Sequence, residues 1–205
     1  MNPAVDVVIP LSAESVFGDF ELRMALRSID LYGRNVGRIH LVCEALPEWC
    51  CNVRHLPHGD PHRCNKDANL FAKLLFACRS PEVSERFLFW SDDQLALRAF
   101  DAARLPPVAN NRAARHFSDR NRWQRRMLHT FAYLRGRGLT PDWNWDSHVP
   151  QPIDKQRFLR LIAPVDYAVL PGFCINTLYF GLAGVKPLVM QSQVKLTCES
   201  DCAAT

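Results

Sequence analysis

Two adjacent carboxylates, Asp92 and Asp93, directly follow the apolar run Arg-Phe-Leu-Phe-Trp at residues 86–90. This run predicts a buried strand, and ligands of open α/β sheets bind beyond the carboxyl ends of such strands. Neighbouring carboxylates repel each other unless a cation or hydrogen-bond donors offset their charge. Mg²⁺ and Mn²⁺ prefer carboxylate oxygens and share their coordination sphere with phosphates. The pair therefore predicts a divalent-cation site that neutralises a diphosphate, although two carboxylates that merely cap a turn remain the alternative.

Lys66, Asn69 and Lys73 lie at positions i, i+3 and i+7 of a segment with helical periodicity. This spacing puts the three side chains on one face of a helix. Ammonium and amide groups on one face would suit the phosphates of a nucleotide facing an acidic metal site. The alternative is a solvated helix face without a ligand.

Three further side chains are candidates for the same site. Arg23 and Arg27 are one turn apart in an earlier helical segment and could contact phosphate, or could pair with Glu21 and Asp30. His148 lies in a loop and could supply a nitrogen ligand to the metal or transfer a proton. The alternative for His148 is an ordinary surface histidine.

The segments that must position these groups alternate between apolar runs and amphipathic stretches. Such alternation predicts a mostly parallel sheet flanked by helices, in one α/β domain over residues 1–190. The polar segment 191–205 is expected to be a flexible tail. The predicted strands are 5–11, 38–43, 51–56, 86–90 and 167–170, the predicted helices are 20–32, 66–78, 122–134, 152–162 and 176–182, and loops are expected at 104–111 and 136–149.

Composition restricts the class of protein. The 205 residues carry a net charge of +4, which favours anionic ligands such as nucleotides without choosing among them. No apolar run reaches the roughly 18 residues of a membrane-spanning helix, and residues 1–10 do not resemble a secretion signal. The eight cysteines are expected to be reduced thiols, so we expect a cytoplasmic protein.

One competing interpretation is a structural zinc site. Cysteine and histidine are concentrated in residues 50–64, and zinc binds such side chains, although a paired Cys-x-x-Cys motif is missing and the segment is rich in turns. The candidate zinc ligands are Cys50, Cys51, His55, His58, His62 and Cys64.

A second competing interpretation is binding of nucleic acid by the basic segment 112–137. Its arginines could hold phosphates while aromatic residues stack on bases, and the alternative is a solvated helix with a buried aromatic face. The segment contains Arg112, Arg115, Arg120, Arg122, Arg125, Arg126, Arg135 and Arg137, interleaved with Trp123, Phe131 and Tyr133.

Several segments, taken in order, resemble nucleotide-diphospho-sugar transferases of the GT-A type, and most closely their Stealth-like branch of bacterial and phage enzymes. The similar segments are 21–29, 38–42, 86–93, His148-Val149-Pro150 followed by Lys155, and 175–180. The resemblance implies a three-layer α/β/α fold and a nucleotide-diphosphate sugar as donor. It also implies that Asp92 and Asp93 form the acidic metal-binding motif and that His148 is the late histidine of the family.

These observations together predict a metal-dependent glycosyltransferase that uses Mn²⁺ or Mg²⁺ and a hydroxyl acceptor, either a glycan or a modified base in phage DNA. Asp93 is expected to bind the metal, and Asp92 the ribose or the hydration shell of the metal. The sequence Leu-Ser-Ala-Glu at 11–14 replaces the acidic loop of the resembling enzymes, which favours glycosyl transfer over sugar-phosphate transfer. The alternatives are a Stealth-type sugar-phosphate transferase for polysaccharide synthesis and a non-catalytic nucleic-acid-binding or zinc-stabilised interaction domain.

Overall fold

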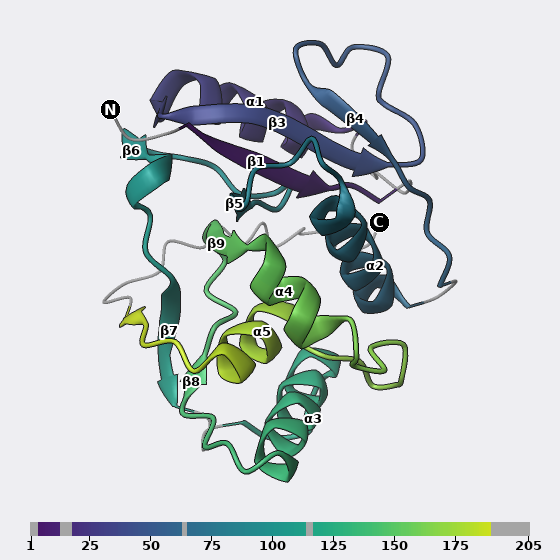
Figure 1. Cartoon of the computed structure of the whole chain (residues 1–205), viewed down its shortest axis with the longest axis vertical. Helices are drawn as coiled ribbons and strands as arrows, with labels where there is room; N and C mark the ends of the chain where they lie inside the picture. Colours follow the sequence, from purple (N-terminus) through teal and green to yellow (C-terminus); the bar gives the residue numbers. More distant parts are fainter. Residues whose placement is uncertain (1–3, 13–17, 63–64, 114–116, 190–205) are drawn as a thin grey trace, which may run out of the picture.

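The central sheet has five strands in the order β4-β3-β1-β5-β9 (Figure 1). A computed structural model describes residues 4–12, 18–62, 65–113 and 117–189, so the predicted tail 191–205 lies outside the described residues. Strands β1, β3, β4 and β5 are parallel, and β9 is antiparallel to β5, which confirms the mostly parallel sheet. The strands are β1 (Val5–Pro10), β3 (Val36–Cys43), β4 (Arg54–Pro57), β5 (Arg86–Phe89) and β9 (Gln151–Asp154).

Strand β1 is apolar along most of its length because it is central in the sheet and covered on both faces. Val7, Val8 and Ile9 are fully buried. Ile9 pairs with Leu41 of β3, and Val8 pairs with Phe89 of β5. The carboxyl ends of β1 and β5 therefore meet at one edge of the sheet.

Helices cover both faces of the sheet, which confirms the three-layer α/β/α arrangement (Figure 1). Leu22 and Ile29 of α1 pack with Val7, Ile9 and other side chains of one sheet face. On the opposite face, Val8 belongs to a second core that also contains side chains of the other four helices. The helices are α1 (Phe20–Tyr32), α2 (Lys66–Arg79), α3 (Arg122–Gly136), α4 (Lys155–Ile162) and α5 (Ile175–Ala183).

Two small sheets complete the fold. In one, β2 pairs with β6, and in the other, β7 lies between β8 and β10. The predicted loop 104–111 thus contains most of β7, and a 3-10 helix (Ala102–Arg104) precedes it. The short strands are β2 (Gly33–Arg34), β6 (Phe100–Asp101), β7 (Val108–Ala113), β8 (Trp143–Asn144) and β10 (Leu188–Val189).

Two predicted elements differ from the structure. Residues 167–170 form turns rather than a strand, and they lead into a cis peptide bond between Leu170 and Pro171. The predicted helix 152–162 begins only at Lys155, because the preceding residues pair with β5 as strand β9. Asp154 ends that strand and caps α4, since its carboxylate accepts a 2.7 Å hydrogen bond from the amide of Arg157.

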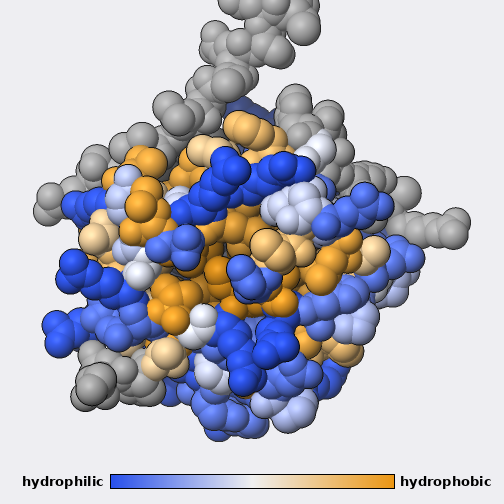
Figure 2. Space-filling view, turned by 90° about the horizontal axis from the view of Figure 1, so that it is seen from above, coloured by the Kyte–Doolittle hydropathy of each residue, from blue (hydrophilic) through white to orange (hydrophobic). Residues whose placement is uncertain are grey.

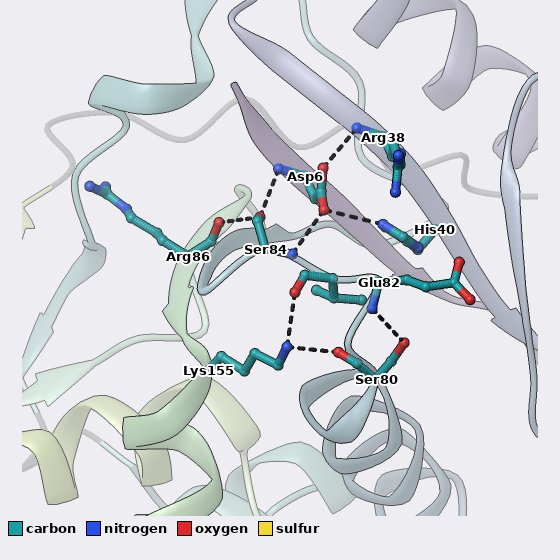
Figure 3. Close-up of polar contacts among 9 residues, drawn as sticks. Asp6, Arg38, His40, Ser80, Glu82, Ser84, Arg86 and Lys155 are labelled. Carbon is teal, nitrogen blue, oxygen red and sulfur yellow. Dashed lines mark hydrogen bonds and ion pairs between the residues drawn. The ribbon is translucent and has the colours of Figure 1, made fainter. Parts of the chain in front are cut away.

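A buried carboxylate joins three segments at the amino ends of the strands (Figure 3). Asp6 of β1 accepts hydrogen bonds from the amides of Arg38 (2.8 Å) and Ser84 (2.9 Å), and lies 3.3 Å from His40 Nε2. Burial alone would raise the pKa of Asp6, but the His40 contact and the two amide bonds outweigh it and lower the pKa. Asp6 therefore stabilises the edge of the sheet opposite to Asp92.

Lys155, which lies in the same region as Asp6, has a structural role (Figure 3). Its buried ammonium group donates to the carbonyl oxygens of Ser80 (2.7 Å) and Val83 (2.9 Å) and so fastens α4 to the carboxyl end of α2. Asp154 pairs with Arg86 at the start of β5, so Lys155 lies at the edge of the sheet opposite to Asp92. It does not share a site with the acidic pair.

One face of the molecule has apolar side chains near its centre. Seen from above, hydrophobic surface gathers in the middle of the face, with hydrophilic side chains around much of it (Figure 2). No helix within the described ranges is long and apolar enough to cross a membrane. The cysteines with described placement, which are Cys43, Cys50, Cys51, Cys78 and Cys174, are free thiols.

Candidate functional site

A cavity of about 260 Å³ lies at the sheet edge where β1 and β5 end. The structure brings four of the predicted residues to this cavity, Asp92 from the segment after β5 and Lys66, Asn69 and Lys73 from one face of α2. The carboxylate of Asp92 thus shares a cavity with the ammonium groups of Lys66 and Lys73. The lining residues are Pro10, Leu11, Ser12, Asp60, Lys66, Asn69, Leu70, Lys73, Phe89, Ser91 and Asp92.

Lys73 connects three parts of this cavity. Only 3% of its surface is exposed, and its ammonium group donates a 2.6 Å hydrogen bond to the carbonyl of Leu11 at the end of β1. The same group lies 2.6 Å from a carboxylate oxygen of Asp60. Asp60 was not among the predicted site residues, and its only signal in the sequence is its place in a turn-rich loop between Gly59 and Pro61.

Asn69 binds the backbone of the loop that carries Asp60. Its amide oxygen accepts from the amide of His62 (2.8 Å), and its amide nitrogen donates to the carbonyl of His62 (3.1 Å). Asn69 is therefore a positioning residue here, because both polar atoms are occupied by the backbone. Lys66 is exposed and makes no ion pair with any described residue, so it presents a free ammonium group at the cavity.

The segment 91–94 after β5, which we call the acidic turn, is held by contacts of Trp90, Ser91 and Gln94. The indole of Trp90 donates to the carbonyl of Gln94 (2.8 Å), and the amide of Ser91 donates to the side chain of Gln94 (3.1 Å). Burial, followed by repulsion from Asp93, raises the pKa of Asp92. The protein thus holds Asp92 at a cavity where the charge of its carboxylate is incompletely compensated. Such a carboxylate is a suitable ligand for a hard cation.

Asp93 differs from Asp92 in its exposure and in its position relative to the cavity. It is exposed and does not line the cavity, whereas Asp92 does. Among the residues that the structure describes, no three His, Cys, Asp or Glu side chains come together in a group that could hold a metal ion. A cation at Asp92 would therefore take its remaining ligands from substrate phosphate and water.

His148 does not line the cavity either. It is exposed and has a left-handed backbone conformation with φ 49°. Because Gln151 pairs antiparallel with Phe89, the segment before Gln151 and the segment after Phe89 leave the sheet at the same edge. His148 and Asp92 therefore share an edge of the sheet but not a cavity.

Arg23 and Arg27 lie in a different place from the acidic pair. They line a separate hollow of about 410 Å³ between α1 and residues 49–53. The guanidinium group of Arg23 stacks on the ring of Trp49 at 4.3 Å. The prediction that the two arginines join Asp92 in one phosphate site has no support from this placement.

The proposed zinc ligands with described placement do not converge. His55 contacts the carbonyl of Cys43 (3.0 Å), and His58 contacts the carbonyl of Gly59 (2.7 Å). His62 packs the edge of its ring against Tyr167. Cys64 lies outside the described residues, and the described members of the cluster have separate structural roles.

The basic helix α3 uses its aromatic residues in the core. The indole of Trp123 donates to Asp146, Phe131 is fully buried, and Tyr133 packs edge-on against Phe173. Phe131 is therefore not available to stack on bases, and Trp123 and Tyr133 are half-buried against the core, which favours the alternative of a helix with a buried aromatic face. In addition, Arg126 pairs with the buried carboxylate of Asp67, while the side chains of Arg112 and Arg115 lie outside the described part of the chain.

Comparison with known proteins bears on the fold. No protein-family model matches the chain, and no curated protein sequence matches it. A 4-diphosphocytidyl-2C-methyl-D-erythritol synthase from Anaerococcus prevotii DSM 20548 superimposes with a TM-score of 0.50 at 12% identity, over 98% of this chain and 93% of that chain.

Two further solved structures match less well. Mouse xyloside xylosyltransferase 1 has a TM-score of 0.44 at 12% identity, over 89% of this chain and 81% of that chain. A second 4-diphosphocytidyl-2C-methyl-D-erythritol synthase has a TM-score of 0.39 at 16% identity, over 98% and 96% of the two chains. These scores are too low to support an argument, so the conclusion rests on the first match, and the chain has an α/β fold similar to that of the Anaerococcus synthase.

Proposed function

We propose that this protein is a metal-dependent glycosyltransferase that moves a sugar from a nucleotide-diphosphate donor to a hydroxyl acceptor. The observation that carries the proposal is the cavity at the carboxyl edge of the sheet, where Asp92 shares the lining with Lys66 and Lys73. A carboxylate and an ammonium group that is unpaired among the described residues, in one cavity, suit a cation and the diphosphate it neutralises. The fold of the Anaerococcus synthase, whose name describes a diphosphocytidyl compound, agrees with a nucleotide ligand.

The proposed reaction replaces one bond at the anomeric carbon of the sugar with another. The bond from this carbon to the diphosphate oxygen breaks, and the acceptor oxygen forms the new bond. The acceptor hydroxyl loses its proton, and the nucleoside diphosphate leaves with the electron pair of the broken bond. A Mn²⁺ or Mg²⁺ ion would stabilise the negative charge that develops on the diphosphate.

The residues of the chain have distinct proposed roles. Asp92 would bind the metal, and exposed Asp93 would contact its hydration shell, which exchanges the roles expected from sequence. Lys66 would contact the donor phosphates, while Asn69 and Lys73 would hold the walls of the cavity in place. His148, at the same edge of the sheet, would transfer a proton or complete the metal site when substrate is bound.

We further propose that the chain belongs to the GT-A type and its Stealth-like branch, on the order of the similar sequence segments. The by-product distinguishes the possible reactions of this fold. Glycosyl transfer releases a nucleoside diphosphate, sugar-phosphate transfer releases a nucleoside monophosphate, and nucleotidyl transfer releases pyrophosphate.

The test is to incubate the purified chain with UDP-, GDP-, CDP- and dTDP-sugars and Mn²⁺, with water in place of the acceptor hydroxyl, and to separate the nucleotides by anion-exchange chromatography. We expect a nucleoside diphosphate that forms with Mn²⁺, fails to form with EDTA, and fails to form with the Asp92→Ala variant. Asp30→Ala is the matched control, because Asp30 is exposed on α1 and does not line the cavity. Release of nucleoside monophosphate in place of the diphosphate, or equal turnover by Asp92→Ala, would contradict the proposal.

A further inference from the structure

We infer that a second, apolar hollow beside the acidic turn binds the body of the acceptor, and that the acceptor is an alcohol with an aromatic or aliphatic portion. The inference rests on the proposed function and specifies its acceptor. The hollow has a volume of about 610 Å³, within the usual range of pockets that hold small organic molecules. It is lined by Ala96, Leu97, Arg98, Phe100, Leu105, Pro106, Val108, Val149, Pro150, Leu188 and Val189.

Large apolar side chains stay exposed around this hollow. Leu97 is 70% exposed and Leu188 is 60% exposed, although both belong to a chain with a well-buried core. Scattered exposed leucines need no explanation, but several around one hollow indicate a site for an apolar ligand. Covering them with a ring or an alkyl chain would remove apolar surface from water and favour binding.

Two of the segments that line the hollow are neighbours in sequence of Asp92 and His148, the residues at the proposed catalytic edge. Residues 96–98 follow the acidic turn of Asp92 after only a few residues, and Val149 and Pro150 directly follow His148. The pairing of Phe89 with Gln151 holds these two segments side by side. The hollow therefore takes part of its lining from the same two segments that leave the sheet at the proposed catalytic edge.

The charge of the lining selects among possible acceptors. Among the described residues, Arg98 is the only charged residue that lines the hollow, and it makes no ion pair with any of them. A nucleic acid or another polyanion requires several cations along its path, so this lining disfavours DNA as the acceptor. One arginine at the border of an apolar hollow suits instead a small apolar alcohol, with or without a single acidic group.

The probe for the hollow is 8-anilinonaphthalene-1-sulfonate, whose fused rings fit an apolar site and whose sulfonate fits Arg98. We expect saturable fluorescence enhancement with the folded full-length chain, and about tenfold weaker binding for Leu97→Asp. Leu31→Asp is the matched control, because Leu31 is 72% exposed and lines no part of the hollow. Arg98→Ala should weaken this probe but leave the uncharged N-phenyl-1-naphthylamine unaffected.

The acceptor class is tested by competition. 4-Nitrophenyl β-D-glucopyranoside should displace the probe, and free glucose at the same concentration should not. Absent probe binding, equal binding by Leu97→Asp, or displacement by glucose as effective as by the aryl glucoside would overturn the inference. So would a dimer that Leu97→Asp dissociates in size-exclusion chromatography, because the hollow would then be an interface between copies.

These measurements need no donor sugar, so they are independent of the proposed glycosyl transfer. If the probe binds as described but no nucleotide sugar is turned over, the proposed function fails while the apolar site stands. If turnover occurs but the aryl glucoside neither binds nor accepts sugar, the acceptor inference fails while the proposed function stands.

Discussion

The ammonium group of Lys73 lies 2.6 Å from a carboxylate oxygen of Asp60 and 2.6 Å from the carbonyl oxygen of Leu11. This arrangement joins helix α2, the loop after β4 and the end of β1 at one wall of the proposed donor cavity. Lys73 is almost fully buried, whereas 27% of the Asp60 side chain is exposed. The pair therefore has a structural role in shaping the cavity whether or not a donor is bound.

Replacing Lys73 should cost stability as well as donor binding. Lys73→Met keeps a long apolar side chain but leaves the Leu11 carbonyl and the Asp60 carboxylate without their partner. We expect the free energy of unfolding to fall by about 1–3 kcal/mol, the usual cost of a buried polar group left unpaired. Urea denaturation followed by circular dichroism measures this change.

Lys66→Met is the matched control on the same helix. Because Lys66 is exposed and unpaired among the described residues, its loss should change stability by less than about 0.5 kcal/mol while it weakens donor binding. Equal stability of the two variants would show that the Lys73–Asp60 contact does not support the cavity.

Asp92→Asn should stabilise the protein at neutral pH when no metal is present. Burial and Asp93 raise the pKa of Asp92, so the folded state holds this proton more tightly than the unfolded chain does. Stability is therefore lost as pH rises from the ordinary value of 3.8 through the higher folded pKa. The neutral asparagine avoids this loss.

The melting temperature of Asp92→Asn, measured by differential scanning fluorimetry in EDTA, should exceed that of the native protein at pH 7. The difference should shrink as the pH approaches 3.8. Asp30→Asn, on an exposed face, is the control and should show no such gain. A lower melting temperature for Asp92→Asn at pH 7 would mean that its carboxylate serves to stabilise the fold.

Asp6→Asn should have the opposite pH dependence. The pKa of Asp6 is lowered in the folded state, so its contribution to stability is present above the ordinary value of 3.8 and disappears as pH falls through the lower folded pKa. The variant should be less stable than the native protein at pH 7, and the difference should narrow in acid. Urea midpoints measured from pH 7 to pH 3 test this, and a constant difference would contradict it.

Trp123→Phe should affect stability rather than binding of nucleic acid. The substitution removes the indole hydrogen bond to Asp146, whose loss should cost about 1–2 kcal/mol of the free energy of unfolding. Trp143→Phe is the control, because Trp143 is partly exposed. If Trp123→Phe instead weakened salt-dependent binding to DNA without loss of stability, the ring would act in recognition.

Sequence patterns predicted the elements whose periodicity is local and strong. The apolar run of β5 and the i, i+3, i+7 spacing on α2 were enough to place Asp92, Lys66, Asn69 and Lys73 near one sheet edge. Chain reversals were harder to predict, because β9 owes its existence to pairing with β5 rather than to its own pattern.

Side-chain contacts between residues far apart in the chain also could not be predicted from the sequence. Asp60 meets Lys73 in a loop whose backbone at His62 is bound by Asn69, and neither contact has a signal in the sequence. In the same way, the arginines of α1 resembled phosphate ligands by spacing, but Arg23 stacks on Trp49 in another hollow.

The central claim is that Asp92 binds a cation that in turn binds the diphosphate of a nucleotide sugar. The most direct test is the melting temperature of the native chain with UDP-, GDP-, CDP- and dTDP-sugars, each with and without Mn²⁺, since a ligand of the folded state raises it. We predict a rise of several degrees that requires both Mn²⁺ and one nucleotide sugar, is kept by Asp30→Ala, and is absent from Asp92→Ala. An equal rise for Asp92→Ala, or no rise with any donor, would contradict the claim.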